Sequence, residues 1–127
     1  MQKKLAIVCC AALVFTSGCA THQEESKIQE YYKPINAIQR EFYDVQTLFE
    51  SKKYQDVVEA GQEFLAKYQR DILNVAVMYY VGVSYQKLGD YENSDSFLNN
   101  IQKMFPESDW GKLAVVSLAE NKDFRGN

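Results

Sequence analysis

Helical periodicity runs through most of this chain and constrains its fold more than any other feature. Apolar residues recur every three or four positions from residue 35 onward, which is the spacing of one face of an α-helix. The apolar runs cover residues 35–49, 54–68, 72–88, 91–105 and 110–118. No segment alternates apolar and polar residues between two turn signals, as a half-buried strand does. The sequence therefore predicts an all-α domain over residues 34–127, with about five helices and antiparallel neighbours.

The breaks between the runs are short and contain turn residues. They fall at residues 51–53, at Gly89-Asp90 and at Pro106. Pro34 fits best at the first position of a helix, where its missing N–H costs nothing. Residues 19–33 before it are mostly polar and predict a tether rather than a packed element.

The first 18 residues form a targeting segment rather than part of the fold. Lys3 and Lys4 supply positive charge, and residues 5–16 carry none. That apolar stretch is much shorter than the roughly 20 residues that a membrane-spanning helix needs, and it is typical of a secretory signal. The sequence Phe15-Thr16-Ser17-Gly18-Cys19 resembles the lipobox of bacterial lipoproteins, which implies cleavage before Cys19 and acylation of its thiol. The alternative is a conventional signal peptide followed by a chance cysteine.

The positions of the three cysteines favour the lipobox. Cys9 and Cys10 would be discarded with the signal and Cys19 would be acylated, so no free thiol and no disulfide would remain. Removing 18 of 127 residues leaves 109; two of the 14 basic residues go with them, so 12 face 17 acidic ones and the formal charge moves from −3 to −5. A mildly acidic domain lacks the electrostatic footprint of a nucleic-acid partner. Attachment to the membrane is therefore expected through acyl chains on Cys19 and not through charge.

Internal repetition narrows the fold further. Residues 75–108 resemble one tetratricopeptide (TPR) repeat, a helix–turn–helix unit of 34 residues. The repeat-defining residues are Gly82, Tyr85, Leu88, Gly89, Tyr91 and Pro106, with Ser94 and Leu98 at further matching positions. The resemblance implies a close helix crossing at Gly82, a turn at Gly89 with Tyr91 packing back on the first helix, and a closing helix over residues 110–120.

A weaker copy of the repeat lies upstream. Residues 52–54 align with residues 89–91, and Tyr54 and Tyr91 are 37 residues apart, so a short insertion is expected near residues 69–71. Glu41 and Asp44 then occupy positions that are normally apolar. Either the register of that helix is shifted or, as the first helix, it lacks a neighbour there. The sequence therefore predicts about two repeats plus a closing helix, with an unrelated antiparallel helical bundle as the alternative.

The order of aromatic and turn residues between 52 and 117 is similar to the TPR units of bacterial envelope-biogenesis proteins of the BamD and CpoB kind. Those proteins have more repeats than this chain can hold, so only the repeat type is carried over. The resemblance implies a protein-binding role in the cell envelope. The residue after Cys19 is Ala20. In the lipoproteins that this chain resembles, an aspartate at that position opposes sorting to the outer membrane. The alanine therefore favours the outer membrane, with the domain facing the periplasm.

Residues suited to catalysis or metal binding are scarce. His22 is the only histidine and lies in the tether, so a histidine-based metal site or catalytic triad is not expected. The chain also has no glycine-rich loop of the kind that cradles phosphate. We therefore expect no enzymatic activity, no catalytic residue, no metal and no cofactor.

The TPR resemblance implies that the first helix of each repeat lines a groove. The candidate partner-binding residues are Phe42, Gln46 and Phe49 from the first repeat and Tyr79, Val83 and Gln86 from the second. Aromatic side chains suit this role because large rigid rings anchor protein interfaces. The alternative is that Phe42 and Phe49 belong to the core, or are covered by residues 28–32.

These features favour a lipid-anchored adaptor that holds an envelope protein or peptide at the membrane. One alternative is a structural lipoprotein that self-associates, since apolar residues from Ile28 to Phe49 also fit a coiled-coil heptad. Pro34 opposes a continuous coiled coil there. A third possibility is carriage of an apolar ligand in the groove.

Overall fold

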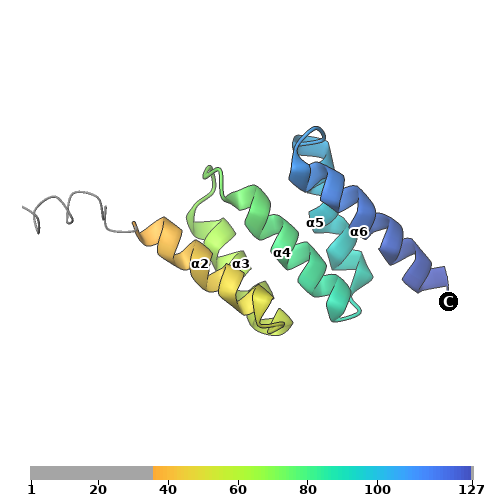
Figure 1. Ribbon diagram of the computed structural model, residues 1–127, viewed down its shortest axis with the longest axis horizontal. Coiled ribbons are helices and arrows are strands. Elements are labelled where there is room, and N and C mark those ends of the chain that lie inside the picture. The colour runs from red at the N-terminus through yellow and green to blue at the C-terminus, as the bar shows by residue number, and fades with distance from the viewer. Residues whose placement is uncertain (1–35, 127) are drawn as a thin grey trace, which may run out of the picture. The chain divides into compact units, whose positions relative to one another are not determined.

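The computed structural model describes residues 36–126, which fold into five α-helices. Predictions on the signal peptide, on Cys19, on the tether and on residues 28–34 lie outside the described residues. The helices are α2 (Ala37–Glu50), α3 (Tyr54–Lys67), α4 (Asn74–Lys87), α5 (Tyr91–Met104) and α6 (Asp109–Gly126), coloured from orange to blue in Figure 1. No strand occurs between residues 36 and 126, and the predicted all-α fold is confirmed.

The helices form two antiparallel pairs and a closing helix. α2, α4 and α6 lie in one layer, and α3 and α5 lie behind them in a second layer (Figure 1). Helix α4 contacts all four other helices, whereas α3 and α5 do not contact each other. In the first layer, α4 therefore packs against both α2 and α6. In the second layer, α3 and α5 each pack on α4 but not on each other.

The two pairs repeat the same lengths. Each of the four paired helices has 14 residues, and both turns within a pair have three, over 51–53 and 88–90. The connection from α3 to α4 spans the six residues 68–73, but that from α5 to α6 spans only the four residues 105–108. The expected insertion near residues 69–71 therefore lies in this longer connection, which leaves the helices unchanged.

Helix α2 begins at Ala37, where a capping box fixes its start. The Asn36 side chain accepts a hydrogen bond from the Gln39 backbone N–H at 2.9 Å, and the Gln39 side chain accepts one from the Asn36 backbone N–H at 3.3 Å. Each bond satisfies an N–H that a helix terminus would otherwise leave unpaired.

The turn at residues 88–90 has the geometry that the repeat predicts. Gly89 adopts a left-handed conformation with φ of 81°, which ends α4, and Asp90 caps α5 by accepting the Asn93 backbone N–H. Lys52, 37 positions earlier, occupies the matching site in the first turn with φ of 58°. A lysine in this conformation is less stable than a glycine because its Cβ crowds the following carbonyl oxygen.

The core consists of two adjoining clusters. The larger one lies among α2, α3 and α4 and contains Val45, Val57, Val58, Phe64, Val77 and Val81. The smaller one lies between α5 and α6 and contains Leu98, Ile101 and Ala114. Gly82 brings α4 close to α5, since a Cβ there would lie 3.1 Å from Leu98 and 3.2 Å from Phe97. The predicted close crossing at Gly82 is confirmed.

The remaining repeat residues occupy varied surroundings. The Tyr85 ring lies 5.8 Å from Phe97, and its hydroxyl accepts a hydrogen bond from Gln62 on α3. Tyr91 stacks on Phe124 of α6 at 6.0 Å, so its ring reaches the closing helix. Leu88 at the end of α4 is 46% exposed and Pro106 is exposed in the turn before α6.

Two acidic residues of α2, Glu41 and Asp44, line the pocket between α2 and α3. Glu41 pairs with Lys67 and accepts a hydrogen bond from the Tyr68 hydroxyl at 3.0 Å, and Asp44 is exposed. The hydrogen bond from Lys67 lowers the pKa of Glu41. In the described part of the chain no further helix covers this pocket, which explains why polar residues occupy positions that are apolar inside a repeat array.

Candidate interaction surface

Aromatic rings from three helices meet across the α2–α4–α6 layer. The Tyr80 ring on α4 lies 4.8 Å from Phe49 and 6.3 Å from Phe42 on α2, and 5.9 Å from Trp110 on α6. Trp110 also lies 5.4 Å from Tyr79. We call these five residues, Phe42, Phe49, Tyr79, Tyr80 and Trp110, the aromatic row.

Helix geometry explains how α4 reaches both neighbours. Consecutive residues of an α-helix point about 100° apart, since the helix has about 3.6 residues per turn. Tyr80 therefore turns toward α2 while Tyr79 turns toward α6, and Trp110 at the start of α6 contacts both rings. The aromatic row links three helices that are not consecutive in the chain.

Each ring of the aromatic row is partly buried and partly open to solvent. Phe42, Phe49 and Tyr80 pack on the larger core cluster, and Tyr79 and Trp110 pack on the smaller one. The two sequence interpretations of Phe42 and Phe49, core and surface, therefore describe two sides of the same rings. Partly buried aromatic groups held by core contacts are well suited to act as rigid anchors.

Two of the predicted groove residues are not exposed. Val83 is 7% exposed and Gln86 is 4% exposed, so the prediction that they face an open groove is wrong. The physical reason is α6, which lies over this part of α4. Gln86 donates hydrogen bonds from Nε2 to Asn121 Oδ1 at 2.8 Å and to the Ser117 backbone carbonyl at 3.0 Å.

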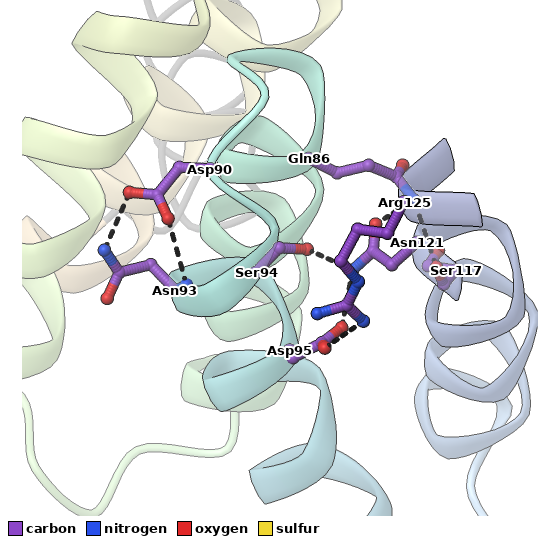
Figure 2. Close-up of polar contacts among 8 residues, drawn as sticks. All are labelled: Gln86, Asp90, Asn93, Ser94, Asp95, Ser117, Asn121 and Arg125. Carbon is purple, nitrogen blue, oxygen red and sulfur yellow. Dashed lines mark hydrogen bonds and ion pairs between the residues drawn. The ribbon is translucent and has the colours of Figure 1, made fainter. Parts of the chain in front are cut away.

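A buried polar network continues from these contacts into α5 (Figure 2). Asn121 donates from Nδ2 to Ser94 Oγ at 2.9 Å and to Asp95 Oδ1 at 2.8 Å, and Asp95 also pairs with Arg125. Ser94 and Asn121 are fully buried. The network fixes α6 against both helices of the second pair, so Gln86 holds the closing helix in place.

Gln46, the sixth predicted residue, remains on the surface. It is partly buried beside the aromatic row and donates from Nε2 to Glu50 Oε1 at 2.9 Å. Burial raises the pKa of Tyr80, and the negative charge of Glu50 adds to this effect. A tyrosine phenol is neutral at physiological pH even without this shift, so Tyr80 keeps its O–H as a hydrogen-bond donor.

Three pockets lie on other faces of the domain. One of about 280 Å³ lies in the gap between α3 and α5, one of about 340 Å³ between α2 and α3, and one of about 270 Å³ between α5 and α6. None of the six predicted partner-binding residues lines any of them.

Sequence reasoning missed Tyr80, Trp110 and Asn121. Tyr80 and Trp110 were counted as packing residues of their helices, and the adjacent pair Tyr79-Tyr80 was the available signal that α4 has aromatic neighbours on both sides. Asn121 was not singled out. It lies four residues after Ser117 and seven after Ala114, on the buried side of α6.

Between residues 36 and 126 no group of three histidine, cysteine, aspartate or glutamate side chains is placed to hold a metal ion. None of the five helices is long and apolar enough to cross a membrane. Comparison of the chain with protein-family models, with curated proteins and with solved structures finds no match.

Proposed function

We propose that this protein is a lipid-anchored adaptor of the bacterial cell envelope, whose helical domain binds a protein or peptide partner on the α2–α4–α6 layer. The domain is of the TPR type in this proposal, and acyl chains on Cys19 hold it at the outer membrane facing the periplasm. The observation that carries the binding role is the aromatic row, five partly open rings in contact across three helices.

The chemistry of this surface favours an apolar or aromatic segment as the partner. Rings held by core contacts lose little conformational freedom when a partner docks, so their contact area contributes efficiently to affinity. Gln46 and Glu50 lie beside the rings and can orient the partner by hydrogen bonds. An amphipathic helix meets both requirements, since one face is apolar and its edges are polar.

Site-specific photo-crosslinking in living cells tests this proposal. A photoreactive amino acid at Gln46 or Glu50 should capture one defined envelope protein, to be identified by mass spectrometry. The matched control is the same amino acid at Ala66, which is exposed on α3 in the other layer. Equal capture from all three positions, or none from Gln46 and Glu50, would contradict the proposed surface.

Trp110 offers a second measurement on the captured partner, because it is the only tryptophan in the chain. Its fluorescence should change when the partner binds to the domain. Tyr79→Ala should weaken binding about thirtyfold, since a central aromatic anchor contributes about 2 kcal/mol. If Tyr79 serves only the core, the same substitution should lower the melting temperature and leave the affinity of the folded fraction unchanged.

A further inference from the structure

Two connections at one end of the helix array carry bulky apolar side chains that the fold leaves exposed. Ile72, in the α3–α4 connection, is 87% exposed, the largest fraction of any bulky apolar residue between 36 and 126. Met104 and Phe105, where α5 ends, are 54% and 43% exposed. Consecutive helices run antiparallel, so both connections lie at the same end of the array as Asn36, which precedes α2 (Figure 1). We call Ile72, Met104 and Phe105 the apolar tips.

The opposite end of the array has a different surface. Its two turns, residues 51–53 and 88–90, contain two lysines and an aspartate. Leu88 is exposed there, and Phe124 near the end of α6 stacks on the Tyr91 ring. The most exposed apolar residue of any connection therefore lies at the other end, where the chain continues from Asn36 toward Cys19.

We propose that the apolar tips insert into the headgroup layer of the membrane that holds Cys19, so that this end of the helix array rests on the lipid surface. The proposal rests on the lipid anchor of the proposed function. Asn36 lies 17 residues after Cys19, a length of chain that spans at most about 60 Å. A link of this length keeps the tips at a high effective concentration beside the bilayer, so a contact too weak to bind alone still forms. The acyl chains supply the attachment, and the tips set the orientation of the domain.

Hydrogen bonds within each connection suit it to this environment. Asp71 Oδ1 accepts the Leu73 backbone N–H at 2.8 Å in the α3–α4 connection. In the α5–α6 connection, the Phe105 carbonyl accepts the Ser108 hydroxyl at 2.7 Å. Backbone groups that are paired within the chain approach an apolar layer at a lower cost in free energy than groups that depend on water. The tips are therefore presented by turns that keep these bonds at the membrane surface.

Charge at this end of the array is balanced. Three basic and three acidic residues lie in or beside the two connections: Arg70, Lys103, Lys112, Asp71, Glu107 and Asp109. Asp109 pairs with Lys112 at 3.7 Å. Arg70 and Lys103 are exposed on long stems, whose charged ends can reach lipid phosphates. Net charge therefore neither holds this end at an anionic bilayer nor repels it, and the apolar tips supply the contact.

Quenching of tryptophan fluorescence by lipids tests the proposal. The chain from residue 19 to residue 127 has one cysteine, so Cys19 can be coupled to a maleimide lipid in vesicles of phosphatidylethanolamine and phosphatidylglycerol. Two reporters, Phe105→Trp and Leu88→Trp, are each made in a Trp110→Phe background, which removes the only native tryptophan. The two sites are 43% and 46% exposed and lie at opposite ends of the array, so they form a matched pair.

Lipids brominated on their acyl chains quench tryptophan only at short range. We expect them to quench Phe105→Trp and to leave Leu88→Trp unquenched. Adding Ile72→Asp to the Phe105→Trp chain should remove most of the quenching, whereas adding Leu88→Asp should not. A circular-dichroism melt checks that each variant folds, and Ile72→Trp is the second reporter if Phe105→Trp does not.

Equal quenching at the two ends of the array, or none at the tips, would overturn the proposal. So would capture of one envelope protein, and of no lipid, by a photoreactive amino acid at Phe105 in living cells. The coupling to the vesicle is chemical, so these results do not depend on acylation of Cys19 in the cell. Incorporation of labelled palmitate tests that part of the proposed function separately.

Discussion

Gln86 on α4 and Asn121 on α6 are joined by a hydrogen bond of 2.8 Å although both side chains are buried. Buried polar groups cost free energy unless their partners are present, so each residue depends on the other. This pair links the closing helix to the rest of the domain by a specific contact, in addition to apolar packing.

A double-mutant cycle should reveal this dependence. Asn121→Leu removes one hydrogen-bond partner from each of Gln86, Ser94 and Asp95. Gln86 keeps its bond to the Ser117 carbonyl and Asp95 keeps its pair with Arg125, but the buried Ser94 hydroxyl loses its bond, and the free energy of unfolding should fall by about 2–4 kcal/mol. Gln86→Leu should cost less, because Asn121 retains its bonds to α5. The double variant should be more stable than the sum of the two losses predicts. Strict additivity in urea unfolding would show that the two side chains act independently.

Lys52 has a left-handed backbone conformation, so replacing it with glycine should stabilise the domain. Gly89 occupies the matching site of the second turn, and glycine adopts this conformation without steric cost. Lys52→Gly should therefore raise the free energy of unfolding by up to about 1 kcal/mol. Gly89→Ala provides the converse variant and should lower it by a similar amount. Thermal melts of both variants measure the effect, and a lower melting temperature for Lys52→Gly would contradict it.

The Asp90 cap predicts a pH dependence of stability. Hydrogen bonds from Asn93 lower the pKa of the Asp90 carboxyl in the folded state. Its contribution is therefore fully present above the unfolded pKa of about 3.9 and is lost as the pH falls through the lower folded value. Asp90→Ala should lower the melting temperature at pH 7, and the difference from wild type should shrink in acid. Asp90→Asn keeps a capping oxygen and should behave like wild type at pH 7. A difference between wild type and Asp90→Ala that stays constant down to pH 2 would count against this role.

Substitutions at two glycines should lower the free energy of unfolding by different amounts. A Cβ at Gly111 would overlap the carbonyl oxygen of Phe105, which belongs to the backbone and cannot rotate away. Gly111→Ala should therefore destabilise the domain by about 2 kcal/mol or more. Gly82→Leu should cost several kcal/mol, on the order of the overpacking costs of protein cores, because Leu98 and Phe97 fill the space. Gly126→Ala meets nothing within 4 Å and serves as the control in the same melts.

The anchor can be tested through Cys19. Cys19→Ser should abolish incorporation of labelled palmitate and release the protein from the membrane fraction, or leave it uncleaved. The circular-dichroism spectrum of the helical domain should not change, because the described core lies between residues 36 and 126. Equal labelling of wild type and variant would refute the assignment of Cys19.

Local patterns made most of the fold predictable. The spacing of apolar residues located five helices, and Gly89 and Gly82 marked a turn and a helix crossing. The start of α2 at Ala37 is set by the capping box that Asn36 forms with Gln39, two residue types whose three-residue spacing is visible in the sequence.

The candidate surface was harder to predict because it depends on which helix covers which. Val83 and Gln86 were assigned to a groove on the assumption that the first helices of the repeats are open on that side. α6 extends to Gly126, and its Asn121 and Ser117 pair with Gln86. The partner of a buried glutamine lies 35 residues away, and helical periodicity contains no information on such a contact.

The carboxylates in the α2–α3 pocket have a consequence for assembly. A stack of helices grows without limit when each end fits the other, and it closes when one end fits only itself. Glu41 and Asp44 line that pocket and make this end of the helix array unsuitable for apolar docking. A further helix stacked there, from another copy of the chain, would bury both carboxylates, which costs free energy unless each is paired. Growth into a filament through the α2 end is therefore disfavoured.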